Sequence, residues 1–175
     1  MSKKEMKKAI INSANIPNVQ KKNIPYVLQL RRQWLMWKLE VNKNGKMTKV
    51  PYSINGKKAD VTDSSSYCSF KEAIKTLKNG DYSGIGFALT EDDNFVFIDL
   101  DGCLDGGESN ELARKTMDSC MSYTEISPSG NGLHIILKGY LPSIDDYLRN
   151  NQLYKIEMYD SKRFMTVTGN IYENS

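Results

Sequence analysis

The feature that most constrains this chain is an apolar run at residues 95–98 that ends in Asp99, Leu100 and Asp101. A short run rich in β-branched and aromatic residues predicts a buried strand. Because side chains alternate along a strand, Asp99 and Asp101 share one face, roughly 7 Å apart at their Cα atoms. Two carboxylates this close repel each other unless a cation lies between them, and an oxygen-rich site suits Mg²⁺ or Mn²⁺. The alternative is a solvated turn, since Asp101-Gly102 is a common turn pair.

Composition places the chain among ordinary globular proteins. Its 175 residues are enough for one domain with a core. Hydrophobic residues make up 39% and charged residues 26%, which is ordinary for a globular protein. No apolar stretch approaches the length of a membrane span, and the Lys-rich N-terminus lacks the apolar segment of a signal peptide. We therefore expect a cytoplasmic protein with no membrane contact. Its net charge of +3 permits nucleic-acid binding without requiring it.

The chain divides into two parts by composition. Residues 1–23 are rich in Lys and Asn and predict a basic arm or short helix, which is either a DNA contact or a solvated face. Residues 24–175 carry the apolar patterns of a folded domain. We expect this second part to hold the functional site.

Helix and strand signals alternate within the domain. Ser69 and Glu72 have the spacing of a capping box and predict a helix that ends at residues 79–80, and Ser109 is the expected cap of a second helix over 109–121. Asn44-Gly45 predicts a hairpin. Further strands are expected at residues 84–89, 95–100, 123–126, 133–138, 154–159 and 164–168, the first two joined as a hairpin by the acidic turn 90–94. The sequence therefore predicts an α+β domain with a mainly antiparallel sheet and flanking helices.

A glycine-rich turn leads into the only histidine of the chain. Residues 127–132 (SPSGNG) precede Leu133 and His134, which begin a predicted strand. Gly130 permits backbone conformations that other residues resist, so the turn that also holds Ser129 can present N–H groups to a phosphate. A lone histidine in a strand is otherwise a structural residue. His134 is thus interpreted either as a phosphate contact or as a buried structural side chain.

A third carboxylate interrupts a later apolar strand. Glu157 lies between Ile156 and Met158, and strand interiors seldom carry an unpaired charge. It either completes a three-carboxylate site with the two aspartates or pairs with a basic neighbour such as Arg163. The planar guanidinium of Arg163 suits a phosphate as well as a carboxylate.

Residues 97–103 (FIDLDGC), 127–134 (SPSGNGLH) and 156–159 (IEMY) follow one another in a specific order. Together they resemble the primase-polymerase domain of the archaeo-eukaryotic primase superfamily, in the branch carried by phages, plasmids and mobile elements. Shorter supporting matches lie at residues 34–37, 49–52, 69–73, 84–87 and 163–169. The resemblance covers roughly residues 34–169 and implies the RRM-like catalytic core of that superfamily.

The resemblance implies a nucleotidyltransferase that acts as a DNA primase or polymerase in the replication of a phage, plasmid or mobile element. It implies that Asp99, Asp101 and Glu157 hold two catalytic Mg²⁺ or Mn²⁺ ions, and that His134 completes the catalytic set. The expected chemistry is phosphodiester formation assisted by two metals.

The resemblance also implies a nucleotide site. His134, helped by Ser129 and Gly130, is expected to contact the phosphates of the incoming nucleotide, and Lys49 and Arg163 are added from their charge and neighbourhood. The implied partners are nucleoside triphosphates, a single-stranded or primed DNA template, and a helicase domain or protein. Domains of this kind usually form the N-terminal part of a longer replication protein, and we expect the same here.

Two other functions are compatible with parts of the sequence. An apolar strand followed by Asp-x-Asp-Gly resembles the nucleophile loop of haloacid-dehalogenase-like phosphatases, in which Asp99 would attack phosphorus and Asp101 would act as acid and base. Cys103 stands where that loop usually has Thr, and the motif lies far from the start of the chain. The other alternative is a non-catalytic DNA-binding module for replication initiation that keeps the primase fold.

Overall fold

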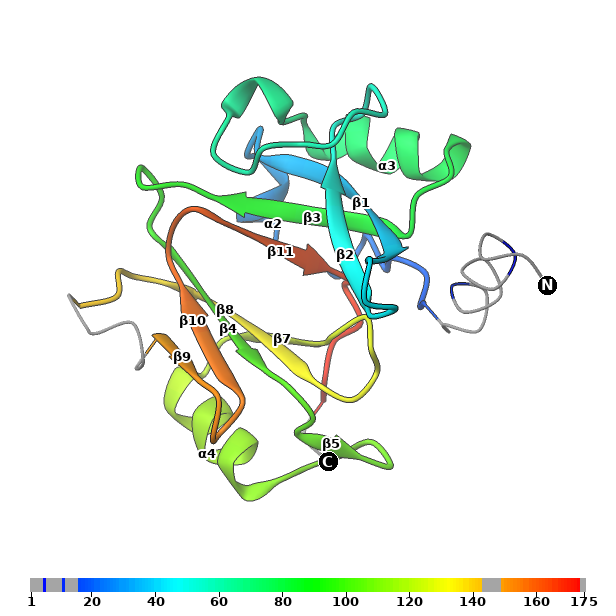
Figure 1. Cartoon of the computed structure of the whole chain (residues 1–175). Helices are drawn as coiled ribbons and strands as arrows, with labels where there is room; N and C mark the ends of the chain where they lie inside the picture. The colour runs from blue at the N-terminus through cyan, green and yellow to red at the C-terminus, as the bar shows by residue number, and fades with distance from the viewer. Residues whose placement is uncertain (1–4, 6–10, 12–15, 143–148, 174–175) are drawn as a thin grey trace.

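The strands of this computed structural model, which describes residues 5, 11, 16–142 and 149–173, form two main antiparallel sheets (Figure 1). The four-stranded sheet has the order β11 (Arg163–Val167), β3 (Gly84–Leu89), β1 (Trp34–Val41), β2 (Met47–Tyr52). The five-stranded sheet has the order β7 (Tyr123–Ile126), β8 (Leu133–Lys138), β4 (Phe95–Leu100), β10 (Ile156–Tyr159), β9 (Asn150–Asn151), and β5 (Leu104–Asp105) pairs separately with β6 (Glu108–Ser109). The predicted α+β class with antiparallel pairing is confirmed, with two sheets in place of one.

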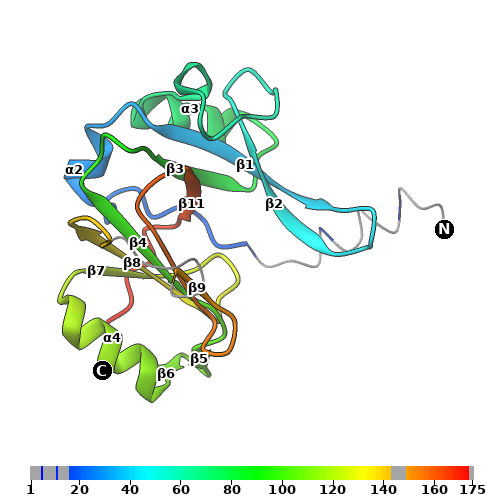
Figure 2. The same ribbon diagram turned by 60° about the vertical axis from the view of Figure 1, so that its left-hand side comes forward.

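The helices are short, and the two longest pack on different sheets. α3 (Phe70–Asn79) packs on the four-stranded sheet and α4 (Glu111–Cys120) on the outer face of the five-stranded sheet, so that the sheets lie between them (Figure 2). α2 (Tyr26–Gln29) and the 3₁₀ turn η1 (Ser64–Ser66) are single turns. The capping box predicted at Ser69 and Glu72 is confirmed at the start of α3.

β4 is buried on both faces. Phe95 and Phe97 enter the core cluster that contains the inner side of α3, whereas Val96, Ile98 and Leu100 enter a second cluster with α4. The prediction of a buried strand at this position is therefore confirmed. Burial on both sides holds the end of β4, and with it Asp99, in one place relative to both sheets.

The predicted hairpin between residues 84–89 and 95–100 is wrong. β3 pairs with β1 on one edge and β11 on the other, while β4 pairs with β8 and β10. β3 therefore has no free edge for β4, and the acidic segment crosses from one sheet to the other. Asp93, which is buried in this segment, accepts hydrogen bonds from the backbone and side chain of Thr90. The hairpin predicted at Asn44-Gly45 is confirmed between β1 and β2.

The predicted cap of the second helix is also wrong. Ser109 pairs with Leu104 in the small hairpin, and the cap of α4 is Asn110, whose side-chain oxygen accepts a hydrogen bond from the amide of Ala113. Serine and asparagine are equally good caps, so local preference could not separate these neighbours.

Only residues 5, 11 and 16–23 of the predicted basic arm belong to the described part of the chain. The amide of Gln20 donates to the Thr168 carbonyl at 2.7 Å, and the Asn23 side chain donates to the Gly169 carbonyl at 3.0 Å. This end of the arm thus contacts the end of β11. The described residues include no helix that is long and apolar enough to cross a membrane.

Candidate functional site

Polar residues form one continuous row across the five-stranded sheet. In the strand register Glu125 lies opposite His134, His134 opposite Asp99, Asp99 opposite Glu157, and Glu157 opposite Asn150. Residues that are opposite one another in antiparallel strands point to the same face, with Cα atoms about 4.5–5.5 Å apart. Three of the four predicted catalytic residues, from three separate segments of the sequence, are therefore neighbours on β8, β4 and β10.

Asp99 lies at the centre of this row. Its Oδ1 atom is 3.7 Å from Nε2 of His134 and, within the described part of the chain, is buried without a hydrogen-bond partner. Burial raises the pKa of Asp99, and the nearby charges of Asp101 and Glu157 raise it further, against the opposing effects of His134 and Lys49. A buried carboxylate oxygen without a hydrogen bond is unfavourable unless another ligand reaches it. This atom fits a bound cation.

The carboxylates border two adjoining hollows. Asp99, His134 and Glu157 line one of ≈ 190 Å³, together with Lys49 and Arg163 from the other sheet.

Asp101 is exposed just after β4 and lines the second hollow, of ≈ 370 Å³, together with Glu157. Among the residues that the structure describes, no three His, Cys, Asp or Glu side chains are gathered closely enough to hold a metal ion as they stand. The metal role of Asp99, Asp101 and Glu157 thus stays a prediction.

Glu157 contacts neutral groups. Its carboxylate accepts hydrogen bonds from the Asn150 side chain at 3.0 Å and from the Tyr159 hydroxyl at 2.9 Å. The guanidinium of Arg163 lies over the Tyr159 ring, 4.6 Å from its centroid. Burial and the hydrogen bond to Glu157 raise the pKa of Tyr159, which keeps the hydroxyl as a donor. Tyr159 therefore contacts both residues that the sequence suggested as an ion pair.

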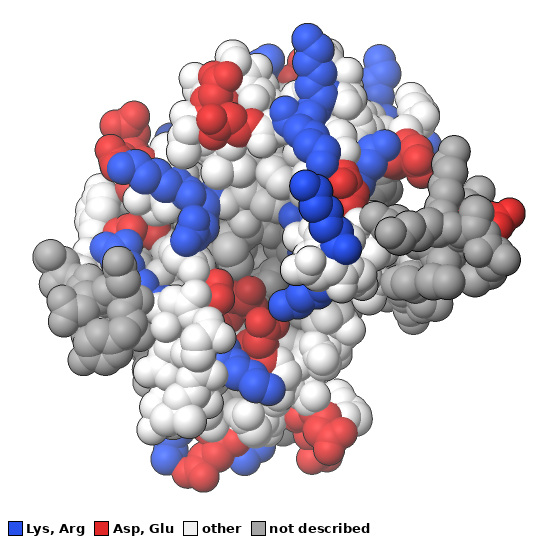
Figure 3. Space-filling view, viewed as in Figure 1, with Lys and Arg blue, Asp and Glu red and all other residues white. Residues whose placement is uncertain are grey.

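Lys49 reaches the site from the opposite sheet. Met36, Tyr52 and Ile85 lie on the face of the four-stranded sheet that packs into the core. Lys49 is three residues before Tyr52 on β2, so its side chain points to the opposite face. That face borders the smaller hollow, which Lys49 lines. The residue as a whole is exposed, but burial of its ammonium end lowers the pKa of Lys49, while Asp99, Asp101 and Glu125 raise it. Space-filling representation shows acidic atoms inside the central depression and basic atoms around it (Figure 3).

The glycine-rich turn is closed on itself. The amide of Gly130 donates to the Ser127 carbonyl at 2.9 Å, and the hydroxyl of Ser129 lies 2.8 Å from that of Ser127 and donates to Asn131. The Gly130 amide is therefore engaged within the turn, and a phosphate role for Ser129 and Gly130 stays a prediction. A Cβ on Gly132 would lie 2.8 Å from the Leu100 carbonyl, so glycine is needed where the turn passes the end of β4.

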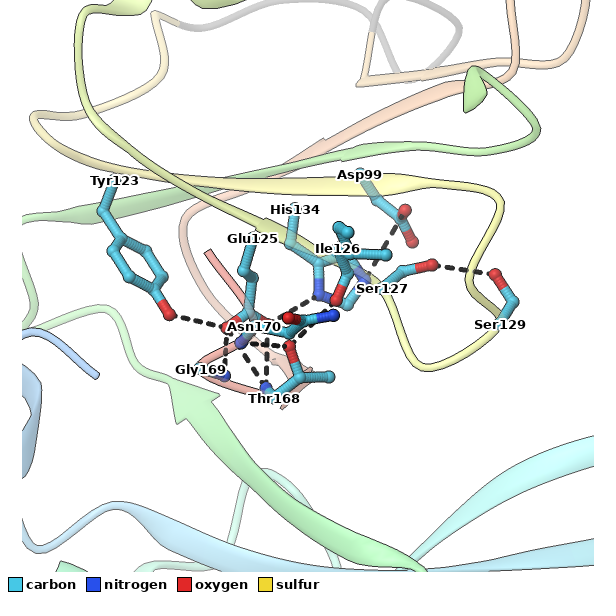
Figure 4. A network of polar contacts seen from close by, with 10 residues as sticks. All are labelled: Asp99, Tyr123, Glu125, Ile126, Ser127, Ser129, His134, Thr168, Gly169 and Asn170. Carbon is cyan, nitrogen blue, oxygen red and sulfur yellow. Dashed lines mark hydrogen bonds and ion pairs between the residues drawn. The ribbon is translucent and has the colours of Figure 1, made fainter. Parts of the chain in front are cut away.

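Sequence reasoning missed Glu125. This residue is fully buried, and the close-up view shows its carboxylate next to His134, on the side away from Asp99 (Figure 4). Its Oε1 atom lies 3.3 Å from Nδ1 of His134. A signal existed, because a hairpin between the predicted strands 123–126 and 133–138 places Glu125 opposite His134.

Comparison with known proteins gives one informative relative. No family model matches the chain. The DNA primase-polymerase of Nitratiruptor phage NrS-1 is 42% identical over 159 residues, an alignment that covers 86% of this chain and 21% of the relative. The chain thus spans about a fifth of the length of that relative. The resemblance that the motifs predicted is confirmed, since over most of its length the chain is homologous to part of a phage primase-polymerase.

Proposed function

We propose that this domain catalyses metal-dependent, template-directed nucleotidyl transfer in the replication of a phage, plasmid or mobile element. The observation that carries the proposal is the row of His134, Asp99 and Glu157 on adjacent strands. Within this row a buried oxygen of Asp99 has no hydrogen-bond partner among the residues that the structure describes. The similarity to a phage primase-polymerase supports the same chemistry. The haloacid-dehalogenase alternative is disfavoured, because the described strands pair antiparallel whereas that class uses a parallel, doubly wound sheet.

Asp99, Asp101 and Glu157 would hold Mg²⁺ or Mn²⁺, and Asn150 and Tyr159 orient the Glu157 carboxylate for this role. When bound, divalent cations lower the pKa of the attacking hydroxyl and neutralise charge that develops on the phosphate. The fixed strand register positions Asp99 and Glu157, whereas Asp101 lies in the turn just after β4.

His134, Lys49 and Arg163 would bind the triphosphate in the smaller hollow, since all three line it beside the carboxylates. The larger hollow, lined by the amide side chains of Asn131, Asn150 and Gln152, would receive the primer or template strand. We propose single-stranded or primed DNA as template, a helicase as partner, and the cytoplasm as the site of action.

The test is incorporation of labelled nucleotides on a single-stranded template, with and without an annealed primer, in Mg²⁺ or Mn²⁺. Product that is lost in Asp99→Asn and retained in Asp92→Asn, which changes an exposed aspartate outside the row, supports the proposal. Hydrolysis of a phosphomonoester without incorporation would instead favour a phosphatase. Template binding without incorporation under any condition would favour a DNA-binding module.

A further inference from the structure

Glu125 accepts hydrogen bonds from one side-chain hydroxyl and two backbone amides. The Tyr123 hydroxyl and the Gly169 amide each donate to its Oε2 atom at 2.8 Å. The Thr168 amide donates to Oε1 at 2.9 Å and to Oε2 at 3.1 Å. Nδ1 of His134 lies 3.3 Å from Oε1 of the same carboxylate. Burial and Glu125 raise the pKa of Tyr123, so its hydroxyl remains a donor.

We propose that Glu125 is a positioning residue that holds a proton on Nδ1 of His134 and thereby directs Nε2 toward Asp99 and the smaller hollow. A carboxylate surrounded by donors offers Nδ1 only an acceptor, so Nδ1 must carry hydrogen. Nε2 then lies on the side of Asp99, where a nucleotide phosphate would be bound. The inference rests on the proposed function in one respect, namely that His134 contacts the nucleotide.

Glu125 is itself fixed by the other sheet. Thr168 and Gly169 follow β11, and the Gly169 backbone has φ +68°, with the Gln20 carbonyl 2.3 Å from the place that a Cβ would occupy. The Gln20 amide holds Thr168 from the other side. The orientation of the histidine on β8 thus depends on the end of a strand in the four-stranded sheet, which links the two walls of the site.

The only histidine of the chain makes a direct test possible. Long-range ¹H–¹⁵N NMR of the imidazole, recorded on the whole chain without nucleotide, shows which ring nitrogen is protonated. We expect a proton on Nδ1 in the wild type. A wild-type Nδ1 without hydrogen would overturn the proposal, whatever any variant does.

The matched variants are Glu125→Gln and Tyr123→Phe. In Glu125→Gln the side-chain oxygen should occupy the Oε2 position, because the Gly169 amide and the Tyr123 hydroxyl both donate there. The NH₂ group then takes the Oε1 position and faces Nδ1. We expect Nδ1 to lose its proton and the affinity for a nucleoside triphosphate, measured by calorimetry, to fall on the order of 10-fold. Tyr123→Phe removes a donor from the same carboxylate without touching the histidine, and is expected to keep both properties.

The outcomes separate this proposal from the proposed function. If Glu125→Gln leaves the proton on Nδ1, or weakens nucleotide binding no more than Tyr123→Phe does, Glu125 has a purely structural role and the proposal fails. If Glu125→Gln does not fold, the wild-type and Tyr123→Phe spectra still decide the protonation state. If His134→Asn binds nucleotide as the wild type does, the phosphate role of His134 fails while the positioning of its ring stands.

Discussion

Glu125 and Asp99 flank the same histidine, yet their surroundings differ completely. Glu125 is fully buried and receives donors from a tyrosine, two backbone amides and the imidazole. Asp99 borders the hollow with a buried oxygen that has no hydrogen-bond partner within the described residues. A saturated carboxylate has no capacity left for a ligand, whereas an unsaturated one is stabilised by binding one. This contrast is the reason for proposing a positioning role for Glu125, at one end of the row, and a ligand role for Asp99, at its centre.

The strongest way to test the contrast is to neutralise the central carboxylate. Asp99→Asn keeps the shape and removes a ligand of the proposed cations, so we expect incorporation to fall about a thousandfold or more. Folding should not suffer, because burial disfavours the charge that the change removes. Primer-extension rates and thermal unfolding measure the two effects. Activity near the wild-type level would refute the assignment of Asp99.

Two glycines with left-handed backbone allow a comparison of packing near Glu125 with packing in the glycine-rich turn. Gly169 lies beside Glu125, and Gly130 lies in the turn before His134. At Gly169 a Cβ would clash with the Gln20 carbonyl, whereas at Gly130, φ +80°, nothing lies within 4 Å. We expect Gly169→Ala to lower the free energy of unfolding by about 2–4 kcal/mol and Gly130→Ala by about 1 kcal/mol. Denaturant unfolding measures the free energy of unfolding of both variants. Equal decreases in the two variants would show that the backbone around Gly169 is not tightly packed.

Divalent cations should stabilise only a chain with an intact centre. Binding to the folded state alone stabilises it by RT ln(1 + [L]/Kd), which is about 2.7 kcal/mol at 100 times Kd. We therefore expect Mg²⁺ or Mn²⁺ to raise the unfolding temperature of the wild type and of Asp92→Asn, but not of Asp99→Asn. An equal rise in all three would mean that the cations bind elsewhere.

The smallest expected effect is a pH dependence in the absence of metal. The pKa of Asp99 is raised in the folded chain, so the folded state holds its proton more tightly than the unfolded state does. This contribution to stability is fully present below the unfolded pKa and is lost as pH rises through the folded pKa. With EDTA present, the stability of the wild type relative to Asp99→Asn should therefore decline from acidic to neutral pH. A constant difference between the two unfolding curves would contradict the raised pKa.

Local signals predicted much of the fold, and they singled out Asp99, His134 and Glu157, which the structure places on adjacent strands. Three predictions are confirmed: the buried strand at β4, the capping box of α3 and the hairpin at Asn44-Gly45. Each depends on a few consecutive residues. The β3–β4 hairpin was wrong, since an acidic turn between two strands does not reveal that both edges of β3 are occupied.

The sequence by itself determined which residues are candidates for the chemistry: Asp99, Asp101, His134 and Glu157 were proposed from their motifs and order. Only the tertiary structure decided their arrangement, because the register of β8, β4 and β10 depends on contacts between segments far apart in the chain. It also decided the environment of Glu125, which is made by Tyr123, Thr168 and Gly169. A carboxylate in a short strand looks the same in sequence whether donors surround it or none do, and that difference separates the proposed positioning residue Glu125 from the proposed ligand Asp99.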